Sequence, residues 1–119
     1  MKVSDIVKSG MFEVVCEGDG TLDVEGVFCC DLLSVAMGKG QAGLAWVTVM
    51  GNINTMAVLH LTDMSCLILA EGTSLDADAE NKALQLNVTV MQSREPIFET
   101  ALKIHEMMHQ PAYAGDSEK

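Results

Sequence analysis

Three apolar runs alternate with helix-forming segments through the middle of the chain, and this alternation constrains the fold more than any other feature. The runs are Ala45–Met50, Ser65–Ala70 and Asn87–Met91. The segments between them begin at Asn52 or Asn54 and at Asp76, and they end near Leu61 and at Leu86. Continuous apolar runs of this length are typical of strands covered on both faces. Because strands joined by helices through short connections lie parallel, the sequence predicts a three-layer α/β fold with a mostly parallel central sheet and flanking helices.

Turn residues predict the elements at the amino-terminal end. A short helix over Ser4–Ser9 is expected to end at Gly10, since glycine is the preferred residue just past a helix. Phe12–Cys16 and Thr21–Val24 are predicted to be two strands joined by a glycine-rich turn, with Gly26–Cys29 continuing in an extended conformation.

Two further helices are predicted from their capping residues. Asp31 can cap a helix through its carboxylate, and Gly38-Lys39-Gly40 is expected to stop that helix. Ser93 is predicted to be the N-cap of a last helix, which runs to about His109. We expect residues 1–110 to form one domain and residues 111–119 to form a flexible polar tail, because 119 residues are enough for a single core.

The charge balance excludes two classes of partner. Seventeen acidic residues against seven basic ones give a net charge of −10, which repels nucleic acid and anionic membranes. No apolar run approaches the ~18 residues that cross a membrane, and the first residues have no long apolar segment, so a cytoplasmic protein is expected. The four cysteines lie mostly in apolar runs without C-x-x-C spacing, which predicts reduced packing residues.

One catalytic string occurs near the carboxyl end of the chain. His105-Glu106-Met107-Met108-His109 matches H-E-x-x-H, in which two imidazoles one helical turn apart bind zinc and the glutamate activates water. A minimal zinc hydrolase is therefore one alternative. It needs a third protein ligand, and only Asp116 or Glu118 in the predicted tail could supply one. A surface histidine pair that binds zinc or nickel without a biological role is the other interpretation.

Other catalytic signatures are missing from the sequence. There is no G-x-x-x-x-G-K-[ST] loop and no G-x-S-x-G elbow. Cys29 and Cys30 lie beside Asp31, whose carboxylate is expected to raise the pKa of a thiol and keep it inert. We therefore predict a protein that is not an enzyme and that holds no cofactor.

The loops that follow the predicted strands are rich in glycine and small polar residues. In open α/β sheets, ligands bind at the carboxyl ends of the strands, where these loops meet. The candidate ligand-binding residues are Thr48, Gly51, Asn52, Asn54, Gly72, Thr73 and Ser93. The same residue types are common in turns and caps, so a purely structural role is an equal alternative.

Three segments of the chain, Gly26–Ser34, Gly51-Asn52 and Leu67–Gly72, together resemble a known family, the DRTGG domain. Gly26–Ser34, which ends in Asp31-Leu32-Leu33-Ser34, is similar to the glycine, extended segment and D-L-L-S block of that family. Gly51-Asn52 and Leu67–Gly72 follow in the same order as the rest of the signature. The resemblance covers nearly the whole chain and implies a fold like the amino-terminal domain of HPr kinase, without the catalytic domain of the kinase.

The resemblance also implies a function. DRTGG domains fused to CBS domains are associated with regulation by adenine nucleotides and pair as dimers, and short versions resemble proteins encoded beside iron hydrogenases. The chain is thus expected to be a non-catalytic regulatory or accessory module that acts as a homodimer, with a possible adenine-nucleotide ligand or protein partner and an accessory role in redox or hydrogenase metabolism. A pure protein-interaction domain without a ligand is the alternative.

The signature itself is altered at two places. Gly51-Asn52-Ile53 stands where the family has Gly-Asp-Arg, and Ala70-Glu71-Gly72 stands where it has Thr-Gly-Gly. The arginine and threonine that could hold a phosphate are thus replaced, and Glu71 is expected to repel one.

Overall fold

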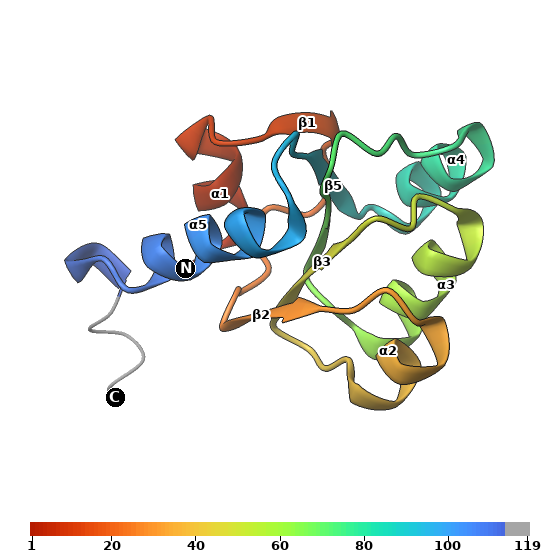
Figure 1. The fold of residues 1–119 in the computed structure, drawn as a ribbon, viewed down its shortest axis with the longest axis horizontal. Helices are drawn as coiled ribbons and strands as arrows, with labels where there is room; N and C mark the ends of the chain where they lie inside the picture. Colours follow the sequence, from red (N-terminus) through yellow and green to blue (C-terminus); the bar gives the residue numbers. More distant parts are fainter. Residues whose placement is uncertain (114–119) are drawn as a thin grey trace.

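The computed structural model describes residues 1–113 and contains one five-stranded sheet (Figure 1). The strands are β1 (Glu13–Cys16), β2 (Gly26–Cys29), β3 (Leu44–Thr48), β4 (Cys66–Leu69) and β5 (Thr89–Gln92). The helices are α1 (Val3–Ser9), α2 (Leu33–Lys39), α3 (Ile53–Thr62), α4 (Ala77–Leu86) and α5 (Ile97–Met108). The strand order is β1-β5-β4-β3-β2, and all neighbours are parallel except β1 and β5.

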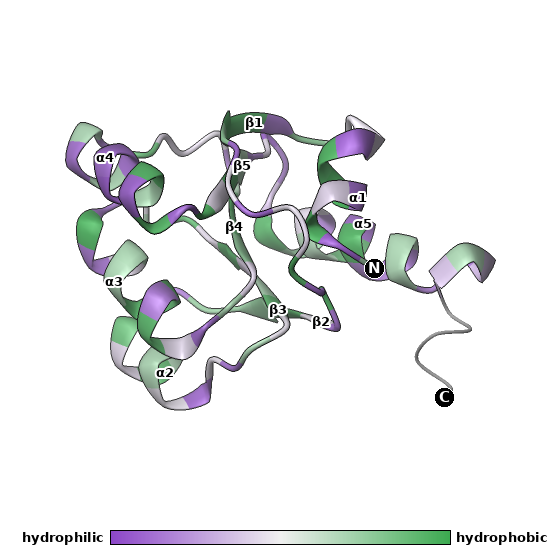
Figure 2. Ribbon diagram, turned by 180° about the vertical axis from the view of Figure 1, so that it is seen from behind, coloured by the Kyte–Doolittle hydropathy of each residue, from purple (hydrophilic) through white to green (hydrophobic). Residues whose placement is uncertain are grey.

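Helices cover both faces of the sheet. Figure 1 shows α2, α3 and α4 on one side and α1 and α5 on the other. Successive strand residues point to opposite faces, so Trp46 and Leu67 join the core under α2 to α4, whereas Val47 and Ile68 join the core under α1 and α5. The central strands β3 and β4, which are buried, are mostly hydrophobic in the hydropathy view (Figure 2). The predicted three-layer α/β fold with a mostly parallel sheet is therefore confirmed.

The predicted hairpin near the amino terminus is wrong. Thr21–Val24 is not a strand, and β1 pairs with β5 rather than with the segment that follows it. The chain must pass from one edge of the sheet to the other before β2 begins, because β1 and β2 are the two edge strands. Backbone contacts hold this passage near the amino ends of the parallel strands. The Asp19 N–H donates to the Asn87 carbonyl at 2.9 Å, for example.

Two predicted helix caps are also wrong, and both side chains make tertiary contacts instead. Helix α2 begins at Leu33, and Asp31 Oδ1 accepts hydrogen bonds from Thr48 Oγ1 at 2.7 Å and from the Val49 N–H at 3.1 Å. Helix α5 begins after Pro96 without a side-chain cap, and the buried Ser93 hydroxyl lies 2.8 Å from Thr100 Oγ1. A cap prediction uses neighbours along the chain only, so it missed these partners in space.

The cysteines divide into two groups. Cys16 and Cys66 are buried packing residues, as predicted, and burial raises the pKa of the Cys66 thiol to about 12. Cys29 is exposed, so its predicted packing role is wrong, because it lies at the end of an edge strand. Withdrawal from water and then the nearby Asp31 carboxylate raise the pKa of Cys29, which favours an inert thiol.

The predicted domain boundary falls near the end of the described part. Residues 111–113 add one more helical turn, in which the Tyr113 N–H donates to the Gln110 carbonyl at 2.9 Å. The rest of the predicted tail, residues 114–119, lies outside the described residues. Within residues 1–113, no helix has both the length and the apolar character needed to cross a membrane.

Candidate ligand site at the carboxyl edge of the sheet

Backbone hydrogen bonds hold the loops after the parallel strands together at one edge. The Gly72 N–H donates to the Ser93 carbonyl and the Glu71 N–H to the Glu95 carbonyl, both at 2.8 Å, so the loop after β4 is bound to the loop after β5. The Asp76 N–H donates to the Gly51 carbonyl at 2.9 Å, which links the loop after β3 to the start of α4. The predicted residues thus lie along one edge, but they do not form one cavity.

The loop after β3 uses its polar residues for structure. Asn52 Oδ1 caps α3 by accepting from the Thr55 N–H at 3.0 Å, so Asn52 rather than Asn54 begins this helix. Thr48 is fully buried, and its hydroxyl donates to Asp31. Gly51 packs against the next loop, where an added Cβ would lie 2.3 Å from the Ser74 carbonyl oxygen. These contacts favour the structural alternative for this loop.

Replacing Asn52 with alanine is expected to lower the free energy of unfolding by about 1 kcal/mol, because the Thr55 N–H loses its acceptor. Asn54→Ala is the matched control, since Asn54 is exposed and does not cap the helix. Its expected effect is within about 0.5 kcal/mol of zero. Urea denaturation of both variants checks this, and equal losses would show that the cap assignment is incorrect.

The loop after β5 lines a cavity of about 440 Å³. Its lining residues are Met11, Glu13, Gly72, Gln92, Ser93, Arg94, Glu95 and Lys103. Two of the predicted residues, Gly72 and Ser93, lie there. Thr73 borders it through its carbonyl, which accepts from Gln92 Nε2 at 2.8 Å. Neither Thr48 nor the predicted residues of the loop after β3 line it, so the sequence prediction found only one part of this cavity.

Sequence reasoning missed the other lining residues for two reasons. Glu13 reaches the cavity because β1 runs antiparallel to β5, which places Glu13 opposite Gln92 in the sheet, and this pairing was not predicted. Lys103 comes from the second turn of α5 and carries no motif. Arg94 could have been recognised from the sequence, because it directly follows the candidate Ser93 and is the single arginine of the chain.

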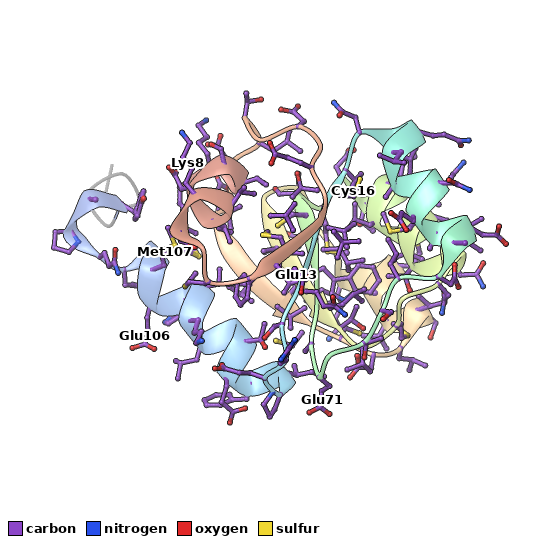
Figure 3. The ribbon with its side chains drawn as sticks, turned by 90° about the horizontal axis from the view of Figure 1, so that it is seen from above. Lys8, Glu13, Cys16, Glu71, Glu106 and Met107 are labelled. Atoms are coloured by element: carbon purple, nitrogen blue, oxygen red, sulfur yellow. The ribbon has the colours of Figure 1, made fainter. Side chains whose placement is uncertain are left out.

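Two cations and two carboxylates give this cavity a mixed charge. Lys103 Nζ lies 2.9 Å from Glu95 Oε1, whereas Arg94 is exposed and forms no ion pair with any residue among 1–113. Glu71 was expected to repel a phosphate, but it does not line the cavity, and it points outward from the loop in Figure 3. Glu71 also adopts a left-handed φ of 60°, which is uncommon for a residue with a side chain.

A second hollow lies at the opposite edge of the sheet and has the wrong charge for an anion. Its volume is about 540 Å³, and Asp19, Asp23, Glu25 and Asp63 are among its lining residues. These carboxylates repel phosphates, and the amino ends of parallel strands are not where open α/β sheets bind ligands. The cavity beside Arg94 is therefore the stronger candidate.

The histidine pair lies on the outer side of α5, away from that cavity. The rings of His105 and His109 are 4.2 Å apart between centroids. Within residues 1–113, no group of three or more His, Cys, Asp or Glu residues could hold a metal ion. The two tail residues considered as a third zinc ligand, Asp116 and Glu118, lie outside the described residues. The described part therefore lacks the three-ligand site that a zinc hydrolase requires.

The fold of this chain is similar to that of a solved structure. The chain is similar to the CBS and DRTGG domains of the regulatory region of a pyrophosphatase from Clostridium perfringens, crystallised with the activator diadenosine tetraphosphate. The TM-score is 0.62 at 16% sequence identity, over 85% of this chain and 44% of the other. No family model and no curated protein matches. The likeness supports a DRTGG-related fold, while the relation to HPr kinase stays a prediction.

Proposed function

We propose that this chain is a non-catalytic regulatory module that binds an adenine nucleotide in the cavity beside Arg94. The observation that carries the proposal is the guanidinium of Arg94, which no carboxylate among residues 1–113 pairs with, at the carboxyl edge of a parallel sheet where Lys103 lines the same cavity. Arginine binds phosphate oxygens through paired N–H donors, and this sheet edge is the usual ligand position in open α/β folds. The similar fold of a regulatory region crystallised with an adenine dinucleotide supports the choice of ligand class.

The size and lining of the cavity fit a mononucleotide. Small-molecule sites commonly measure roughly 300–1,000 Å³, and this cavity of about 440 Å³ lies in the lower part of that range. Glu13 and Glu95 offer carboxylate acceptors for the hydroxyl or amino groups of a ligand, while Arg94 and Lys103 face its phosphate. The acidic surface of the rest of the chain opposes anion binding elsewhere.

A thermal-shift screen of the metal-free protein tests the ligand class. AMP, ATP and diadenosine tetraphosphate are compared with adenosine and with inorganic phosphate. A ligand present at 100 times its Kd adds about 2.7 kcal/mol of stability, which gives a clear rise in Tm. We expect the rise with a nucleotide and not with adenosine, because the phosphate is what Arg94 binds. No rise with any nucleotide would refute the proposal.

A domain that binds only a protein partner is the second candidate. Thr48, Asn52 and Ser93 were candidates for ligand contact, but their side chains are engaged in hydrogen bonds within the protein. Several large apolar side chains are exposed on the helices as well, including Leu61 at 66% and Phe98 at 68%. Silence across the nucleotide screen, together with capture of one partner, would favour this candidate. The homodimer and the accessory role in redox or hydrogenase metabolism are further parts of the proposal, and they rest on the family resemblance.

A further inference from the structure

The outward side of α5 carries a stripe of four residues that the described protein leaves exposed. Phe98 is 68% exposed and Leu102 38% exposed, and His105 and His109 are exposed as well. The opposite side of the helix packs on the sheet. Figure 3 shows Glu106 pointing away from the body of the molecule and Met107 pointing towards α1. We call Phe98, Leu102, His105 and His109 the α5 seam.

The seam residues are spaced along the sequence as contact residues are in a pair of packed helices. Positions 98, 102, 105 and 109 follow each other at intervals of four, three and four, which is the repeat by which one helix packs along another. A two-fold axis parallel to α5 would place each seam residue opposite its own copy, so the stripe is self-complementary. The apolar half, Phe98 and Leu102, would then pack against the same pair.

The two histidines of the seam are arranged as a pair of potential metal ligands. His105 and His109 lie one turn apart with their rings side by side, and His109 Nδ1 lies 2.8 Å from the His105 carbonyl oxygen. When Nδ1 of an imidazole donates a hydrogen bond to a carbonyl oxygen, the other ring nitrogen, Nε2, can bind a metal. Two imidazoles fill only half of the four-coordinate shell of Zn²⁺, and within residues 1–113 no third ligand joins them in a group that could hold a metal ion.

We propose that a second copy of this chain completes the site, so that four histidines, two from each copy, bind one zinc ion and join the α5 seams. The inference rests on the homodimer in the proposed function and names its surface. Stable interfaces bury roughly 1,200 Å² or more, whereas the seam is a single strip along a helix of 12 residues, and two copies of net charge −10 repel each other. Four bonds from histidine nitrogens to one zinc ion supply binding energy that such a strip lacks, and the cation reduces the repulsion locally.

Sedimentation velocity of the metal-free protein, with and without zinc chloride, tests the proposal. The expected result is a monomer without zinc and a dimer with one zinc ion for every two chains. His105→Ala and His109→Ala are expected to stay monomeric in zinc, and Phe98→Ser is expected to weaken the zinc dimer. His60→Ala is the matched control, because His60 is an exposed histidine on α3 outside the seam, and it is expected to dimerise like the wild type.

Three outcomes would overturn the zinc-bridged seam. One is a monomer that binds one zinc ion per chain, which would show a surface pair with no partner. Another is a monomer at every zinc concentration, which would show that the histidine pair does not join two copies. The third is a dimer that forms equally without zinc and survives all three seam variants, which would leave the homodimer intact through another surface. Arg94→Ala, which removes the proposed nucleotide contact, is expected to dimerise normally and so separates the two proposals.

Discussion

Trp46→Ala is expected to lower the free energy of unfolding by about 3–5 kcal/mol, because it empties the largest buried site in the molecule. The indole lies in the core between the sheet and helices α2 to α4, at an angle to the Phe28 ring with 6.5 Å between centroids. Its Nε1–H also donates to the Cys30 carbonyl at 3.0 Å. A domain of this size has a total stability of only about 5–15 kcal/mol, so this loss removes a large part of it and raises the unfolded fraction.

Trp46→Phe is the matched control for this prediction. It keeps most of the aromatic volume and removes mainly the hydrogen bond to Cys30, so we expect a loss closer to about 1–2 kcal/mol. Urea denaturation followed by circular dichroism measures both variants, since Trp46 is the single tryptophan and its fluorescence is lost. Equal losses in the two variants would show that packing around the indole contributes little.

Gly51→Ala is expected to cost about 1–3 kcal/mol, although it adds only a methyl group. The new Cβ would lie 2.3 Å from the Ser74 carbonyl oxygen, and neither can rotate away, because the backbone fixes the position of Cβ and the carbonyl is itself backbone. The loop after β3 must therefore separate from the loop after β4, which also weakens the bond from the Asp76 N–H to the Gly51 carbonyl.

Gly38→Ala makes the same chemical change as Gly51→Ala but is expected to raise the stability of the protein rather than lower it. Gly38 lies within α2, and no atom is found within 4 Å of its added Cβ. Alanine restricts the unfolded chain and favours the helix, so a gain of about 0.5–1 kcal/mol is expected. Thermal or urea unfolding of the two variants side by side checks both signs. A neutral Gly51→Ala would show that the two loops are not in contact.

The central fold could be predicted because its signals are local. The apolar runs that became β3, β4 and β5 are buried on both faces, and Asn52 and Asp76 cap the helices between them through side-chain oxygens. Both the period of burial and the caps involve residues close in sequence. The parallel order of these strands then follows from the short connections alone.

The errors arose where a contact joins distant parts of the chain. Asp31 was predicted to cap its own helix, but Thr48 and Val49 compete for its carboxylate, and nothing near Asp31 in the sequence shows this. The pairing of β1 with β5 likewise depends on which edge of the sheet is open. The candidate site was found only in part for the same reason. Gly72 and Ser93 lie in the loops that follow β4 and β5, whereas Glu13 and Lys103 reach the cavity only through the fold.

Isothermal titration of AMP into the metal-free protein measures the proposed nucleotide binding itself. The wild type is expected to bind one AMP per chain. Arg94→Ala is expected to lose this binding, while Lys39→Ala, an exposed lysine on α2 away from the cavity, is expected to keep it. Binding that Arg94→Ala leaves unchanged, or a wild type that gives no heat with AMP at millimolar concentration, would contradict a nucleotide site beside Arg94.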